Sequence, residues 1–183
     1  LIEPSEKADF RMRMYNADGS RGKMCGNGIR CLGKFVYDNG LTAKKELLIE
    51  TDSGFRTLEL EEENGTVYRV TVNMGSPSVE AADIPIQTKE PRWIDKPIRL
   101  GGRLIHVTCV SMGNPHTVIF TTDLKQIPLV QIGTELEHAK WFPEGTNVEF
   151  IQVVKKNHLR MRVWERGSGE TKACGTGACA SVV

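Results

Sequence analysis

The sequence lacks any apolar run long enough to cross a membrane. No stretch approaches the ~20 apolar residues that a transmembrane helix needs, and the first seven residues lack the charged-then-apolar order of a secretory signal. It also lacks an excess of either charge, because 24 Lys plus Arg balance 23 Asp plus Glu. A net charge of +1 gives no basic surface for nucleic acid or an anionic membrane. We therefore expect a cytoplasmic protein with a small-molecule partner.

The sequence also lacks cysteine pairs of the kinds that hold zinc or form a disulfide framework. Its five cysteines are an odd number, and the spacings Cys25 to Cys31 and Cys174 to Cys179 fit neither pattern. We therefore expect reduced thiols and no metal. The chain starts without Met and stops a few residues into an expected helix, so we expect it to be a fragment.

An internal repeat organises the chain. A shift of 149 positions places residues 11–13 on 160–162 and the Cys-Gly-x-Gly turn 25–28 on 174–177, without a gap. Across the 28 positions 1–28 and 150–177 there are nine identities, whereas unrelated segments would give roughly two. The repeat therefore predicts two structurally similar units.

Each copy has the pattern of a strand, a loop and a helix. In 10–14 and 159–163 apolar residues alternate with arginine, which is typical of a half-buried strand. A polar, glycine-containing loop then leads into each Cys-Gly-x-Gly turn. After the first turn, apolar residues recur at helical spacing over 29–37. We therefore expect Cys25 and Cys174 at helix N-termini.

The remainder predicts β-structure, with one further helix over 127–140. The expected strands are 47–51, 55–62, 67–73, 98–100, 103–111, 117–121 and 147–154. Asn64-Gly65 predicts a hairpin between the second and third of them.

These patterns predict an α+β fold of two lobes related by a pseudo-twofold axis. Each lobe is expected to be a mostly antiparallel, barrel-like sheet packed around a central helix. We place the N-terminal lobe at 1–77, missing its opening and closing segments, and the C-terminal lobe at 78–183, truncated just after the second turn. The pseudo-twofold relation would bring the two Cys-Gly-x-Gly turns face to face.

Two cysteines on opposite sides of one carbon suit stereochemical inversion, because one can remove the proton while the other supplies it. A helix N-terminus favours a thiolate and can lower the thiol pKa from its usual ~8.5. The N–H groups of Gly26-Asn27 and Gly175-Thr176 can hold a carboxylate and stabilise the charge that develops as the α-proton leaves. We predict a cofactor-independent amino-acid racemase or epimerase with Cys25 and Cys174 as the acid/base pair.

The other candidates have simpler readings. Cys31, Cys109 and Cys179 are interpreted as small buried hydrophobes, and His106, His138 and His158 receive no role. His116 is either a surface turn histidine or a site residue. Asn16 and Glu165 occupy equivalent repeat positions at strand ends and are candidate substrate contacts. Neither turn completes a nucleotide-binding motif, so no nucleotide is expected.

Five motifs resemble the diaminopimelate epimerase family and follow the family's order along nearly the whole chain. They are residues 14–20, 24–31, 112–116, 145–149 and 164–178. That family interconverts LL- and meso-diaminopimelate in lysine synthesis, and in bacteria also feeds peptidoglycan, using two cysteines without cofactor or metal. The resemblance implies the same activity here, with Cys25 and Cys174 as the acid/base pair.

The resemblance also implies roles for further residues. The substrate-binding set would be Asn16, Gly26, Asn27, Asn114, Asn147, Glu165, Arg166, Gly175 and Thr176. His116 and Glu165 would tune the thiols. The family's opening and closing segments are absent from this chain, and a homodimer is implied for the full-length protein.

Three alternatives remain. A proline or hydroxyproline racemase of the same fold is disfavoured by Asn27, where that relative typically has His, and by the amide-rich set. A binding or isomerase relative that lost its thiol pair is disfavoured because both cysteines are present. A redox switch that uses a Cys25–Cys174 disulfide stays open.

Overall fold

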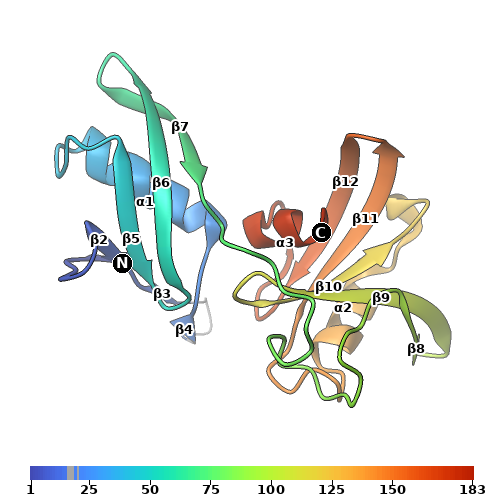
Figure 1. The fold of residues 1–183 in the computed structure, drawn as a ribbon. Coiled ribbons are helices and arrows are strands. Elements are labelled where there is room, and N and C mark those ends of the chain that lie inside the picture. The colour runs from blue at the N-terminus through green and yellow to red at the C-terminus, as the bar shows by residue number, and fades with distance from the viewer. Residues whose placement is uncertain (16–18, 20) are drawn as a thin grey trace. The chain divides into compact units, whose positions relative to one another are not determined.

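The structure, a computed structural model, describes residues 1–15, 19 and 21–183. Asn16, one of the predicted substrate contacts, lies outside the described residues. The chain divides into two compact units, Leu1–Gly75 and Ser76–Val183, which can be followed by colour in Figure 1.

The first unit is a mixed sheet with one helix, α1 (Gly26–Asp38). Its sheet strands are β1 (Ile2–Glu3), β2 (Phe10–Met12), β5 (Glu46–Thr51), β6 (Gly54–Glu63) and β7 (Thr66–Val72), in the order β1-β2-β5-β6-β7. Strands β2 and β5 pair in parallel and the other neighbours antiparallel. A separate two-stranded sheet joins β3 (Met14–Tyr15) and β4 (Arg21–Gly22).

Helix α1 packs on β6 and β7 through the apolar side chains that the sequence spaced at helical intervals. Ile29, Leu32 and Val36 are buried in one cluster with residues of the sheet. The approach is close, because a Cβ at Gly33 would lie 2.8 Å from Leu58 Cδ2. This packing fixes the direction of α1 and therefore the place where it begins.

The second unit is a six-stranded sheet with helices on it. Its strands are β8 (Lys96–Leu100), β9 (Arg103–Ser111), β10 (Pro115–Phe120), β11 (Asn147–Lys155), β12 (His158–Glu165) and β13 (Gly169–Thr171), in the order β13-β12-β11-β10-β9-β8. Only one neighbouring pair within this described sheet, β10 with β11, is parallel. The helices are the short 3₁₀ helix η1 (Leu124–Gln126), α2 (Leu129–Glu137) and α3 (Gly175–Ala180).

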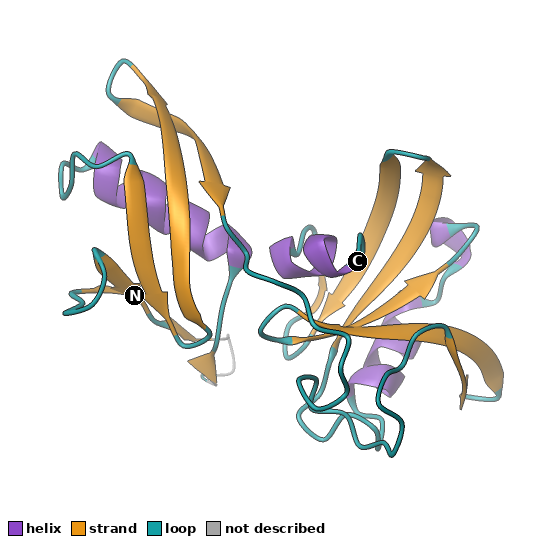
Figure 2. Cartoon of the chain, in the orientation of Figure 1, coloured by secondary structure: helices purple, strands orange, loops and turns teal. Residues whose placement is uncertain are grey.

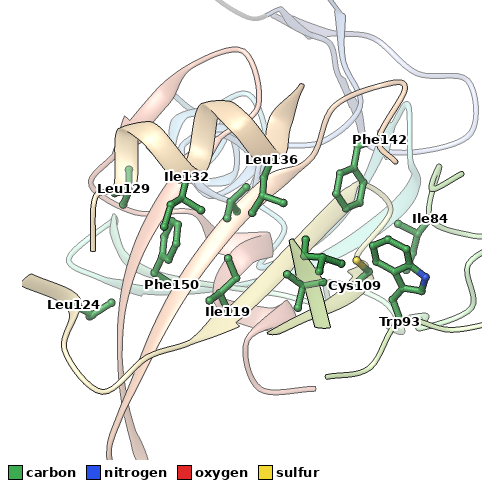
Figure 3. Close-up of a cluster of buried hydrophobic side chains, with 13 residues drawn as sticks. Ile84, Trp93, Cys109, Ile119, Leu124, Leu129, Ile132, Leu136, Phe142 and Phe150 are labelled. Atoms are coloured by element: carbon green, nitrogen blue, oxygen red, sulfur yellow. The ribbon is translucent and has the colours of Figure 1, made fainter. Parts of the chain in front are cut away.

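Helices α2 and α3 lie on opposite faces of this sheet. Val148 and Phe150 of β11 belong to the apolar cluster under α2, with Leu129, Ile132 and Leu136 directed at the sheet (Figure 3). Because side chains alternate along a strand, Glu149 points to the other face, where it meets α3. A polar residue is therefore buried on the side of the sheet that carries Cys174.

The predicted α+β class and its mostly antiparallel sheets are confirmed, and the expected strands recur with small changes at their ends (Figure 2). The Asn64-Gly65 turn joins β6 to β7 with positive φ at both residues, 53° and 78°, as a two-residue hairpin requires. The helix expected over 127–140 is shorter: Pro128 is its N-cap and His138 its C-cap.

A substitution in α2 tests how tightly this helix packs on its sheet. A Cβ at Gly133 would lie 2.5 Å from Trp164 Cγ. We expect Gly133→Ala to lower the free energy of unfolding by about 1–3 kcal/mol, because the ring must move out of a packed core. Urea denaturation followed by circular dichroism measures it. Val130→Ala in the same helix, where the side chain is 60% exposed, is the control and should change little; equal stabilities for the two variants would contradict the packing.

Candidate active site

Each unit places one cysteine at the start of a helix. Cys25 is the N-cap of α1, with extended backbone at φ −139° and ψ 109°, and its Sγ accepts a hydrogen bond from Gly28 N at 3.2 Å. Cys174 is the N-cap of α3, at φ −122° and ψ 117°, and its Sγ accepts from Gly177 N at 3.3 Å. The prediction that both cysteines precede a helix is confirmed, and the two turns share one local geometry.

The thiol of Cys174 is buried, and burial controls its protonation. Desolvation raises the pKa of Cys174 to about 11, against the lowering effects of the Thr176 hydroxyl and the Gly177 N–H, while the charges of Glu165 and Glu149 raise it further. The expectation that a helix N-terminus lowers the thiol pKa is therefore wrong for Cys174. Removing the thiolate from water destabilises it by more than these hydrogen bonds stabilise it. At neutral pH this thiol keeps its proton.

His116 is fully buried, so its interpretation as a surface turn histidine is wrong. Its Nδ1 lies 2.7 Å from Glu149 Oε1, and its Nε2 lies 3.1 Å from Asn114 Oδ1. Asn114 Nδ2 in turn donates to Thr176 Oγ1 at 3.4 Å. Thr176 Oγ1 lies 3.4 Å from Cys174 Sγ, so the predicted residues Asn114, His116 and Thr176 gather beside this thiol.

Three other predicted residues lie at the neighbouring ends of β11 and β12. Asn147 is buried, donates from Nδ2 to Pro115 O at 2.8 Å and accepts at Oδ1 from Arg166 N at 3.0 Å. Arg166 Nη1 donates to Glu144 O at 2.8 Å. Glu165 accepts a hydrogen bond from the Thr171 hydroxyl. Asn147 thus ties the turn that begins at Arg166, directly after Glu165, to β10, the strand that carries His116.

In the first unit, the predicted residues Gly26 and Asn27 form the first turn of α1, directly after Cys25. Arg30, one turn further along, donates to Gly26 O at 3.2 Å and to the Asn27 side chain. This places a guanidinium beside the turn. Cys31 is exposed on the same helix, so its interpretation as a small buried hydrophobe is wrong.

Sequence reasoning missed Glu149 as a site residue. It lies in a strand where Val148, Phe150 and Ile151 are all buried, and its own side chain is 0% exposed. A carboxylate inside an otherwise apolar strand was the available signal, since such a group is buried only with a partner.

The part of the chain that the structure describes holds no group of three His, Cys, Asp or Glu side chains arranged for a metal ion. Within the same described residues, no helix has both the length and the apolar character to span a membrane.

A family model and two curated relatives both match this chain to diaminopimelate epimerases. The family model for diaminopimelate epimerase matches residues 1–80 and 108–183. A diaminopimelate epimerase of Agathobacter rectalis is 51% identical over 189 residues, which cover 100% of this chain and 66% of that protein. The diaminopimelate epimerase of Bacteroides thetaiotaomicron is 54% identical over 184 residues, covering 100% of this chain and 63% of the relative. The chain thus spans about two thirds of the length of these curated relatives.

Two solved structures share the fold. A hydroxyproline epimerase from Agrobacterium vitis has a TM-score of 0.74 at 17% identity and covers 97% of this chain and 56% of that chain. A phenazine biosynthesis protein of the PhzF family from Bacillus anthracis has a TM-score of 0.61 at 21% identity, covering 97% of this chain and 61% of its own.

The charge of Glu165 offers a test of what governs the Cys174 thiol. Because a nearby negative charge disfavours the thiolate, Glu165→Gln should lower the Cys174 pKa and speed its alkylation by iodoacetamide at pH 9 by roughly threefold or more. Peptide mass spectrometry reports the rate at Cys174 alone. Glu144→Gln removes an exposed carboxylate of the same unit and should leave the rate unchanged; a Glu165→Gln rate equal to or below that of wild type would refute the electrostatic account.

Proposed function

Because the chain belongs to the diaminopimelate epimerase family, we propose that the complete protein interconverts LL- and meso-diaminopimelate. The observation that carries the proposal is the match of the whole chain, at 51% and 54% identity, to relatives with this name. The enzyme would be an isomerase of lysine biosynthesis and, in bacteria, of peptidoglycan precursor supply. We expect it in the cytoplasm, as a homodimer of full-length chains.

The proposed mechanism uses Cys25 and Cys174 on opposite faces of the substrate's α-carbon. One sulfur, as thiolate, takes the α-proton and becomes a thiol, while the other thiol gives its proton to the opposite face and becomes a thiolate. No net proton is gained or lost, and the two sulfurs exchange roles for the reverse reaction. The buried Cys174 keeps its proton at neutral pH, which suits it to act as the acid in one direction of the reaction.

The first turns after the two cysteines are suited to the reacting end of the substrate. The N–H groups there can accept the α-carboxylate and the charge that spreads onto it as the proton leaves. We assign the substrate-binding set as Asn16, Gly26, Asn27, Asn114, Asn147, Glu165, Arg166, Gly175 and Thr176. His116 and Glu165 are the residues assigned to tuning the thiols, and the proximity of both to Cys174 supports this.

A proline or hydroxyproline racemase of the same fold is the second candidate. The hydroxyproline epimerase from Agrobacterium vitis supports a shared fold, but its identity to this chain is 17%. Asn27 and the amide side chains of Asn114 and Asn147 favour a substrate with a second polar end. We therefore favour diaminopimelate.

Replacement of either proposed acid/base residue tests the proposal. In the complete protein, Cys25→Ala and Cys174→Ala should each reduce epimerisation by at least about 1,000-fold, because one face of the carbon loses its proton carrier. Proton exchange at the α-carbon of LL-diaminopimelate in heavy water, followed by NMR, measures the step. Cys31→Ala, which changes an exposed thiol, is the matched control and should retain activity. Wild-type rates of exchange and epimerisation in either cysteine variant would show that the acid/base assignment is wrong. A wild-type protein that exchanges the α-proton of proline but not that of diaminopimelate would show that the proposed substrate is wrong.

A further inference from the structure

A carboxylate and an imidazole form a sealed pair behind Cys174. His116 and Glu149 are both 0% exposed, and Nδ1 lies 2.7 Å from Oε1. Helix α3 covers the pair so closely that a Cβ at Gly177 would lie 2.5 Å from Glu149 Oε1. Glycine at this position is therefore required by the carboxylate beneath it, and the first turn of α3 excludes water from the pair.

The surroundings of Glu149 do not favour a full negative charge. Its Oε2 is buried without a hydrogen-bond partner among the described residues. The titratable groups facing it are His116 from β10, Glu165 from β12 and Cys174 before α3. Burial raises the pKa of Glu149, and Glu165 raises it further, while His116 opposes this. A net negative charge in such a place is costly, so burial favours the form of the pair with no net charge, in which one proton lies between Oε1 and Nδ1 and a second proton is on the ring.

The shared proton determines whether Nε2, on the other side of the imidazole ring, donates or accepts a hydrogen bond. Whether the proton lies on Glu149 Oε1 or on His116 Nδ1, the other ring proton is on Nε2. Nε2 then donates to Asn114 Oδ1, 3.1 Å away. The oxygen and the NH₂ group of an amide have nearly the same shape. An N–H on His116 Nε2 therefore determines that the oxygen of Asn114 faces the imidazole. Asn114 is held with its NH₂ toward Thr176, 3.4 Å away.

We propose that Glu149 is a positioning residue of the proposed active site: by keeping a proton in the pair, it makes His116 orient Asn114 as a hydrogen-bond donor toward Thr176 and the substrate's carboxylate. The hydrogen bond from Asn114 to the substrate's carboxylate rests on the proposed function. The orientation of His116 and Asn114 does not depend on that function. The order of contacts is Glu149, His116, Asn114, Thr176 and Cys174.

The first test measures the imidazole directly. In the complete wild-type protein labelled with ¹⁵N-histidine, we expect His116 Nε2 to carry a proton at neutral pH; the resonance is assigned by its loss in His116→Asn. An unprotonated Nε2 at neutral pH would overturn the proposal, because Asn114 would then have to present its oxygen instead. This readout requires no catalysis, so a protein that fails to epimerise diaminopimelate would defeat the proposed function and leave this result standing.

The second test compares two replacements of Glu149. Glu149→Leu leaves Nδ1 without a partner, so the imidazole ring loses the contact that fixes it against Asn114, and the KM for LL-diaminopimelate should rise roughly tenfold, with a smaller change in kcat. Glu149→Gln can donate its amide N–H to Nδ1 and keep the proton on Nε2, so it should restore a KM close to that of wild type. A Gln variant that folds and has the same KM defect as Leu would contradict the proposal.

The pH dependence separates positioning from packing. Loss of the shared proton at high pH should raise the KM of wild type, whereas the Gln variant has no carboxyl to titrate and its KM should rise less. Identical KM profiles for wild type and Gln would overturn the proposal. The matched control is Asp95→Asn, which alters the exposed partner of His106 at 3.0 Å and should leave the KM, its pH profile and the His116 resonances unchanged.

Discussion

The structure depends on a cysteine thiol that serves as a helix N-cap. In each unit the sulfur accepts a hydrogen bond from the backbone N–H three residues later, at 3.2 Å for Cys25 and 3.3 Å for Cys174. The extended backbone at the cysteine turns directly into helix, so the thiol is held beside the N–H groups of the first turn. The same hydrogen bond that caps the helix therefore also positions the thiol proposed as an acid/base group.

Burial decides how that group behaves. A cap hydrogen bond favours a thiolate, yet the pKa of Cys174 is raised to about 11 because the packed second unit removes its sulfur from water. The apolar cluster under α2 holds β10 and β11 together, and on the opposite face the parallel pairing of these strands places His116 opposite Asn147. The buried carboxyl group of Glu149 is tolerated there because His116 Nδ1 lies within hydrogen-bond distance, 2.7 Å from its Oε1.

Much of this arrangement follows from local sequence signals. The strand, loop and helix around Cys25, its recurrence around Cys174, and the hairpin at Asn64-Gly65 all come from patterns spanning a few residues. What the sequence does not show depends on contacts between distant residues. The parallel pairing of Phe10 with Ile49 is one example, and the burial of His116 is another. The prediction of a lowered pKa for Cys174 considers only the helix N-terminus. It leaves out the desolvation of the thiol, which tertiary packing determines.

The central proposal is that the two N-cap thiols act on one carbon. The most direct measurement is a crystal structure of the complete protein with meso-diaminopimelate bound. The account predicts that Cys25 Sγ and Cys174 Sγ both lie within about 3.5 Å of the same α-carbon, on opposite faces of it. A substrate whose α-carbon meets only one of these sulfurs, or meets both from the same side, would contradict it.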